Sequence, residues 1–230
     1  MIDGVIFDKD GTLFDFRRSW GEWAETLIRQ IARDEDHAAQ LGQAIGYDLT
    51  TGTFAPDSPV IAATASDIAA ALHPHLPGQS VVGVAALINA AAARAQMVPA
   101  VPLRPLLEIL RAKGLRVGLA TNDTEVPARA HLAAHGLTDL FDFIAGYDSG
   151  HGAKPGPGMC LAFARQTGLD PARVAMVGDS LHDLHAGRAA GMLCIAVLTG
   201  IATQADLAPH ADVVLPDIGA LPLWLAGRAA

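Results

Sequence analysis

The chain has 230 residues, 51% of them apolar, and a formal net charge of −8. This length supports one well-packed core, or one core with a small accessory domain. The acidic balance, with no basic cluster beyond Arg17 and Arg18, argues against a surface that follows nucleic-acid phosphates. We therefore expect that nucleic acid is not a partner of this chain.

The segments that bear on cellular location predict a cytoplasmic chain without a membrane contact. No basic region opens the N-terminus, and three aspartates within the first ten residues interrupt any apolar signal segment. Residues 81–97 are rich in alanine and contain Asn89 and Arg94, which predicts an amphipathic or buried helix instead of a membrane span. Cys160 and Cys194 lie in apolar segments and are expected to be packed, reduced thiols.

The first part of the chain predicts one strand followed by a block of helices. Residues 4–7 form an apolar run that is typical of a short buried strand. Apolar residues then recur with helical spacing, and helices are expected at residues 20–33, 36–45, 66–72 and 81–97. Ser66 is the expected N-cap of the third helix, and residues 47–59 predict a loop before it.

Beyond residue 99 the pattern alternates short apolar strands with helices. Strands are expected at residues 116–121, 143–145, 174–178, 193–198 and 213–215. This alternation predicts a parallel sheet with helices on both faces, which the first strand must join because it cannot stand alone among helices. The predicted fold class is therefore α/β. A Rossmann-like core is formed by residues 1–15 and 100–230, and a small all-helical cap is inserted at residues 16–99.

Polar side chains follow most of the expected core strands, at the point where each strand ends. They are Asp8 and Asp10, then Thr121, Asn122 and Asp123, then Lys154, and finally Asp179 and Asp183. Ligands of open parallel sheets bind beyond the carboxyl ends of the strands, so these residues predict one common site. Taken singly, each has a simpler explanation: a hairpin turn at Asp10, a helix N-cap at Thr121 or Asp179, and a solvated lysine at Lys154.

The expected gathering of carboxylates predicts a metal ion. Several carboxylates that meet a single lysine are costly without further positive charge, and ligands that are all oxygen favour Mg²⁺. His182 and His185 have a spacing that suits ligation from one helix, but no third nitrogen or sulfur ligand follows at a suitable spacing, so zinc is disfavoured. His151 is expected to be exposed to solvent.

Four short segments resemble, in order, the motifs of the haloacid dehalogenase (HAD) superfamily. Asp8-Lys9-Asp10-Gly11-Thr12 resembles motif I, DxDGT, and Thr121-Asn122 is similar to motif II. Lys154-Pro155 resembles motif III, and Gly178-Asp179-Ser180 with Asp183 resembles motif IV. The match covers about residues 1–15 and 100–220, and the helical block is similar to the small cap of that family. Within the superfamily the chain is most similar to the phosphoglycolate phosphatase-like branch.

This resemblance implies a phosphatase that forms an aspartyl-phosphate. Asp8 is then the nucleophile that attacks phosphorus. Asp10 is the acid that protonates the leaving alkoxide and the base that later activates water. The implied cofactor, Mg²⁺, is held by Asp8, the backbone carbonyl of Asp10 and Asp179, while Asp183 acts through a water molecule or by orienting Asp179.

The resemblance also implies which residues bind the transferring phosphoryl group. Thr121, the backbone N–H of Asn122 and Lys154 hold its oxygens. Gly11 lets the backbone approach closely. The implied substrate is a small phosphorylated metabolite, either phosphoglycolate-like or a sugar phosphate, and the chain is expected to be a monomer or a homodimer.

Substrate choice is expected to lie in the cap. Arg17 is a candidate for binding a substrate carboxylate, although Arg17 and Arg18 also fit an exposed pair beside a hinge, with Trp20 packed in the cap. Asp123 departs from the basic, small or neutral residue expected after motif II. It either repels an anionic substrate or caps the following helix, and we favour the cap.

Two other functions remain open. A sugar-phosphate mutase of the same superfamily requires a basic residue in the cap, and the three lysines of the chain, Lys9, Lys113 and Lys154, all lie outside the helical block. A non-catalytic binding or regulatory protein with this fold is the second alternative, and the intact aspartates of motif I argue against it. A true dehalogenase has no alkoxide to protonate, so Asp10 favours phosphate esters.

Overall fold

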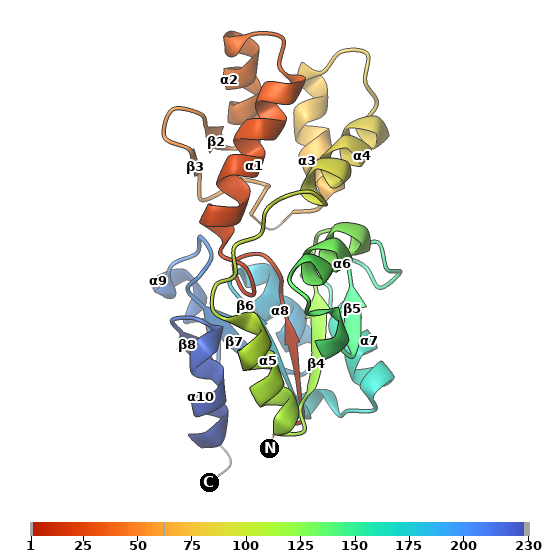
Figure 1. Ribbon diagram of the computed structural model, residues 1–230, viewed down its shortest axis with the longest axis vertical. Coiled ribbons are helices and arrows are strands. Elements are labelled where there is room, and N and C mark those ends of the chain that lie inside the picture. The colour runs from red at the N-terminus through yellow and green to blue at the C-terminus, as the bar shows by residue number, and fades with distance from the viewer. Residues whose placement is uncertain (1, 62, 228–230) are drawn as a thin grey trace.

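The computed structural model describes residues 2–61 and 63–227, which form a lower α/β part and an upper helical part in Figure 1. The α/β part is built on a six-stranded sheet with the order β5-β4-β1-β6-β7-β8, and every neighbouring pair is parallel. The strands are β1 (Gly4–Phe7), β4 (Arg116–Ala120), β5 (Phe143–Ala145), β6 (Val174–Gly178), β7 (Leu193–Val197) and β8 (Val213–Leu215). The α/β fold expected from the alternating pattern is confirmed.

The position of β1 in the middle of the sheet decides where the site lies. The chain leaves β1, continues through β4 and β5 on one side, and then crosses to β6 on the other side. Phe7 pairs with Leu119 of β4 and with Val177 of β6, so these strands end at the same level. The order of the strands along the chain thus reverses at β1. Open α/β sheets bind ligands in the crevice at such a point, beyond the carboxyl ends of the strands.

Helices cover both faces of the sheet, as its strands of nearly continuous apolar residues require. Val5 and Phe7 pack in one hydrophobic cluster with α5 and α10, whereas Ile6 points to the other face and packs with α7. The helices of the α/β part are α5 (Leu103–Ala112), α6 (Glu125–Ala134), α7 (Gly158–Thr167), α8 (Leu181–Ala189), α9 (Gln204–Leu207) and α10 (Leu221–Gly227). Short 3₁₀ helices are found at Thr138–Leu140, Pro171–Arg173 and Ile218–Ala220.

The upper part consists mainly of helices and follows β1 in the chain (Figure 1). Its elements are α1 (Phe16–Ile31), α2 (Glu35–Ala44), β2 (Tyr47–Asp48), β3 (Thr53–Phe54), α3 (Ala65–Leu72), a 3₁₀ turn (His73–His75) and α4 (Val81–Ala92). The two connections to the sheet run side by side, because the Asp15 N–H donates to the Val98 carbonyl and the Ala100 N–H donates to that of Leu13. No helix of the described residues is both long and apolar enough to span a membrane.

Three local expectations for this part are wrong in detail. The first helix begins at Phe16 because Asp15 caps it, with its carboxylate accepting a hydrogen bond from the Arg18 N–H. The third helix is capped by Thr64 in a reciprocal pair with Asp67, not by Ser66. The expected loop contains the antiparallel pair β2–β3, whose turn is held by Asp48 side-chain hydrogen bonds.

Candidate active site

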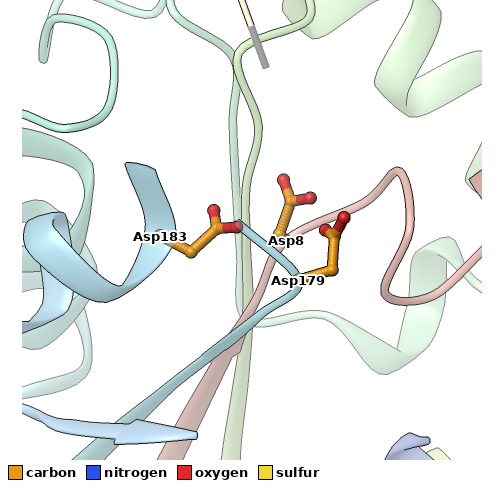
Figure 2. Close-up of side chains that lie close together, drawn as sticks. All are labelled: Asp8, Asp179 and Asp183. Atoms are coloured by element: carbon orange, nitrogen blue, oxygen red, sulfur yellow. The ribbon is translucent and has the colours of Figure 1, made fainter. Parts of the chain in front are cut away.

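Three aspartates meet at the carboxyl ends of the central strands. Asp8 follows β1, Asp179 follows β6, and Asp183 lies in the first turn of α8. Figure 2 shows their carboxylates gathered around a common space. One oxygen from each lies within 4.8 Å of the others, and all three side chains are buried. We call these three residues the acidic cluster.

Lys154 is the cation that contacts the acidic cluster. Its Nζ lies 2.5 Å from Asp8 Oδ1 and 2.6 Å from Asp183 Oδ1, and it donates to the Ala120 carbonyl at 2.8 Å. Burial lowers the pKa of Lys154, but the charges of Asp183 and Asp8 outweigh it and raise the pKa overall. One ammonium thus faces three carboxylates, and the cluster keeps an excess of negative charge.

The acidic cluster is short of positive charge, and the pKa shifts of its members reflect this. Burial raises the pKa of Asp8 to about 7; the charges of Asp183 and Asp10 add to this, while Lys154 opposes it. Burial and the charges of Asp8 and Asp183 raise the pKa of Asp179 well above its usual range. A hard divalent cation with oxygen ligands is the group that such a donor set accepts.

The Asp179 carboxylate is enclosed by two loops. Thr12 Oγ1 donates to Asp179 Oδ1 at 3.3 Å. A Cβ atom on Gly11 or on Gly200 would overlap the same carboxylate, and Gly11 also has a positive φ of 80°. The close backbone approach expected at Gly11 is therefore an approach to Asp179. The sequence reasoning did not identify Gly200, which follows β7 and has no motif of its own.

A second group of polar side chains surrounds the buried Lys9, for which the sequence predicts no role. Lys9 is fully buried, and its Nζ lies 3.0 Å from Asp10 Oδ2, 3.0 Å from Asp123 Oδ2 and 3.0 Å from His131 Nδ1. Burial lowers the Lys9 pKa, but the charges of Asp10 and Asp123 raise it overall. We call Lys9, Asp10, Asp123 and His131 the Lys9 cluster.

The Lys9 cluster joins the sheet to the helical part. Trp20 of α1 donates its indole N–H to Asp10 Oδ1 at 2.8 Å, and Lys9 Nζ lies 5.2 Å from the centre of a Trp20 ring. His131 Nε2 lies 2.7 Å from the Ala92 carbonyl of α4. A carbonyl only accepts hydrogen bonds, so Nε2 carries the proton and Nδ1 is left to accept from Lys9.

The expected role of Asp123 as a helix cap is wrong. The N-cap of α6 is Thr124, one residue later. Asp123 instead uses Oδ2 for the ion pair with Lys9 and Oδ1 to accept from the Thr124 N–H at 2.9 Å. The unusual residue after motif II is therefore the partner of the lysine inside motif I, and this pairing accounts for the acid at position 123.

Motif II supports Lys154 through the backbone. The Asn122 side chain accepts from the Lys154 N–H at 2.8 Å and donates to the Lys154 carbonyl at 2.9 Å. Thr121 is buried at the end of β4, and its Oγ1 accepts from the Asp123 N–H at 3.1 Å. The bridging role of the Asn122 side chain was not expected, whereas its backbone N–H as a phosphate donor stays a prediction.

A cavity lies between the two parts of the molecule, and both motif I aspartates line it. The α/β part contributes Asp8, Asp10, Thr121, Asn122, Asp123, Lys154, Ser180 and His182. The helical part contributes Trp20, Trp23, Val60, Ile61, Ala63, Ala65, Ile68, Ile88 and Ala92. Most of the residues expected from the strand ends line this cavity, whereas Asp179 and Asp183 do not line it and meet Asp8 in the acidic cluster.

Some candidates lie apart from this cavity. Arg17 is exposed on α1 and is not among the lining residues, and the same holds for Arg18. His151 lies near the Phe143 ring, 6.1 Å between centroids. His185 Nε2 lies 3.3 Å from His210 Nδ1. Among the described residues, the group that could hold a metal ion consists of the three aspartates and includes no histidine.

Comparisons with known proteins agree with this arrangement. A family model described as haloacid dehalogenase-like hydrolase matches residues 2–191. A phosphoglycolate phosphatase of Rhodospirillum rubrum is 30% identical over 242 residues, which cover 98% of this chain and 91% of that protein. The crystal structure of CbbY from Rhodobacter sphaeroides in complex with phosphate shares the fold, with a TM-score of 0.74, 20% identity and coverage of 96% of each chain.

A β-phosphoglucomutase structure from Clostridium difficile also shares the fold, with a TM-score of 0.67, 19% identity, and coverage of 99% of this chain and 96% of that one. At such identity, the structural likeness supports the fold alone. The family model and the R. rubrum relative extend over most of the chain. On this evidence the chain belongs to the haloacid dehalogenase-like hydrolase family.

Proposed function

We propose that this chain is a Mg²⁺-dependent phosphatase that hydrolyses a small phosphate monoester through an aspartyl-phosphate on Asp8. The observation that carries the proposal is the division of labour between the two carboxylates of motif I. Asp8 belongs to the acidic cluster, whereas Asp10 accepts a hydrogen bond from Trp20 and pairs with Lys9. Asp8 and Asp10 both line one cavity. Two carboxylates in different surroundings are suited to different chemical roles.

The acidic cluster fits the proposed cation. Its donors are buried carboxylate oxygens that outnumber the Lys154 ammonium, and the raised pKa values of Asp8 and Asp179 support an additional cation there. Asp8, Asp179 and Asp183 would hold Mg²⁺, with the Asp10 backbone carbonyl as a further ligand. When bound, Mg²⁺ supplies positive charge that lets an anionic ester approach the aspartates.

Asp8 carries out the first step. One of its oxygens forms a bond to phosphorus while the ester P–O bond breaks, and the bonding electrons leave with the alkoxide. Asp10 gives a proton to that oxygen, which releases the alcohol. The Lys154 ammonium stays beside Asp8 and offsets the charge of the transferring group.

Asp10 also serves the second step. As a carboxylate it takes a proton from water, whose oxygen bonds to phosphorus as the bond to Asp8 breaks, and inorganic phosphate leaves. The hydrogen bond from Trp20 and the contact with Lys9 orient the Asp10 side chain. Thr121, Asn122 and Lys154 bind phosphoryl oxygens in this proposal.

We assign residues 16–99 the role of a cap that closes the cavity over the substrate. The paired connections at residues 13–15 and 98–100 join this block to the sheet. The mutase alternative has a structural neighbour, the β-phosphoglucomutase. A mutase is expected to need a basic residue in the cap, and the described residues of the helical part contribute none to the cavity.

The test is hydrolysis of p-nitrophenyl phosphate by purified protein, with Mg²⁺ and with EDTA. We expect turnover that requires Mg²⁺ and falls about a thousandfold or more in Asp8→Asn, because that amide is a poor nucleophile. The Asp8→Asn protein is expected to unfold cooperatively. Folded protein without turnover in Mg²⁺ would favour a binding protein, and near-normal activity of Asp8→Asn would reject Asp8 as the nucleophile.

A further inference from the structure

The wall that the helical part contributes to the cavity is mainly apolar. Among the described residues, those that the helical part contributes to the cavity are all aliphatic or aromatic, and the Trp23 indole N–H is a buried donor there without a hydrogen-bond partner. Trp20 and Trp23 form its aromatic side, with ring centroids 4.9 Å apart in an edge-to-face arrangement. Ile68 and Ile88 are buried, and Ile61 lies at the half-buried margin. Apolar walls with few polar groups bind the apolar parts of ligands.

The cations near this cavity are already occupied. Lys154 is paired with Asp8 and Asp183, and it lies on the phosphate side. Lys9 is fully buried between Asp10 and Asp123. Neither ammonium is left to bind a second anionic group of the substrate.

The remaining basic side chains offer little to a substrate carboxylate. Arg17 and Arg18 are exposed and do not line the cavity. His182 does line it, but from α8, on the same side as the acidic cluster. A carboxylate on the leaving group would therefore be buried against apolar side chains and close to Asp10 and Asp123, where desolvation and repulsion both oppose it.

We propose that the leaving group of the substrate is an uncharged, largely apolar alcohol. The inference rests on the proposed phosphatase function and narrows the class of substrate. In it, the α/β part binds the phosphate and the helical part contacts the alcohol. It separates this chain from an enzyme selective for phosphoglycolate, whose leaving group carries a carboxylate. It also replaces the role in carboxylate binding that the sequence analysis offered for Arg17.

The test compares three small esters that differ in charge: propyl phosphate, 2-phosphoglycolate and phosphoethanolamine. We expect kcat/KM for propyl phosphate to exceed both others by about tenfold or more, because a buried, unpaired charge is costly. Phosphoethanolamine is included because tryptophan faces and carboxylates also attract ammonium groups. A preference for either charged ester overturns the inference while leaving the phosphatase intact. Absence of turnover on these esters and on p-nitrophenyl phosphate overturns both proposals.

A charge placed on the cavity wall provides the second arm. Ile61→Arg is expected to raise the ratio of kcat/KM for 2-phosphoglycolate to that for propyl phosphate by about tenfold, because the arginine pairs with the carboxylate. Ile61→Gln, matched for position without charge, should leave the ratio within about twofold. Val82→Arg places the same charge on α4 at a side chain that is 80% exposed and outside the cavity, and should also leave it unchanged. An Ile61→Arg protein with wild-type melting and an unchanged ratio shows that this wall does not contact the leaving group.

Discussion

Asp8, Lys9 and Asp10 are consecutive in one motif, but Asp8 belongs to the acidic cluster and the other two belong to the Lys9 cluster. The two clusters differ in how far their carboxylates are paired with cations and hydrogen-bond donors. In the acidic cluster, three carboxylates face one ammonium, and the pKa values of Asp8 and Asp179 are raised. In the Lys9 cluster, two carboxylates share one lysine and also accept hydrogen bonds from Trp20 and from the Thr124 N–H.

This difference indicates that the acidic cluster requires a bound cation, whereas the Lys9 cluster is stabilised by contacts within the chain. Excess buried charge is unstable unless a cation is bound, so the acidic cluster suits a metal and an anionic substrate. In the Lys9 cluster each carboxylate contacts Lys9 and accepts a further hydrogen bond from within the chain, so the cluster suits the task of holding Asp10 in one orientation. In the proposed function, residues that are neighbours in the sequence thus serve metal binding and proton transfer separately.

The different roles of the two clusters are tested most strongly by neutralising one carboxylate in each cluster. Asp179→Asn and Asp10→Asn should each lower kcat by about a hundredfold or more, the first through the metal and the second through proton transfer. Only wild type and Asp10→Asn should gain stability from Mg²⁺. At a hundred times the dissociation constant the gain is about 2.7 kcal/mol, or roughly 5–10 °C in Tm for a chain of this size.

Thermal melting with Mg²⁺ and with EDTA measures that gain for each variant. Asp8→Asn is a useful companion, because it removes a proposed ligand and should also weaken the response. If Asp10→Asn loses the Mg²⁺-dependent rise in Tm while Asp179→Asn keeps it, the assignment of the two clusters is reversed.

The next largest effect concerns the stability of the Lys9 cluster. Lys9→Met leaves the half-buried Asp10 and Asp123 close together and without their cation, which should cost about 3 kcal/mol in the free energy of unfolding. The double variant Lys9→Met/Asp123→Asn removes the repulsion and should recover part of the loss. Urea denaturation measures both, and Lys113→Met, at an exposed lysine, is the control.

The same variant separates stability from catalysis. A misplaced Asp10 matters most when the leaving alcohol needs a proton, so Lys9→Met should lower turnover of propyl phosphate more than that of p-nitrophenyl phosphate. Equal losses on both esters would mean that Lys9 stabilises the fold without positioning Asp10.

Much of this site follows from the order of motifs along the chain. Parallel strands end at one edge of the sheet, so residues after β1, β4 and β6 meet there whatever the details of packing. That rule brings Asp8, Thr121 and Asp179 together from the sequence alone. The buried, apolar strands predict the helices on both faces in the same way.

The Lys9 cluster does not follow from such rules. Lys9 and Asp123 are separated by 114 positions, and no periodic pattern indicates which buried charges will pair. The lysine between the two aspartates of motif I and the acid after motif II are unrelated features of the sequence until the structure brings them together. Arg17 shows the converse, because its position beside the motif does not decide which face of α1 it occupies.

The smallest expected effect tests the state of His131 in the Lys9 cluster. Burial, and next the charge of Lys9, lower the His131 pKa from its ordinary 6.5 to about 4. The folded state therefore binds fewer protons than the unfolded state between these pH values, and stability is lost as the pH falls from 6.5 to 4. The loss for one buried histidine is on the order of 3 kcal/mol.

Urea denaturation in EDTA at pH 7.5, 5.5 and 4.5, for wild type and His131→Gln, isolates this contribution. Glutamine can still donate to the Ala92 carbonyl and accept from Lys9, but it does not titrate. Other groups titrate equally in both proteins, so the stability difference between them should shift in favour of His131→Gln as the pH falls. A difference that is independent of pH would mean that His131 binds its proton as readily in the fold as in the unfolded chain, and that Nδ1 does not accept from Lys9.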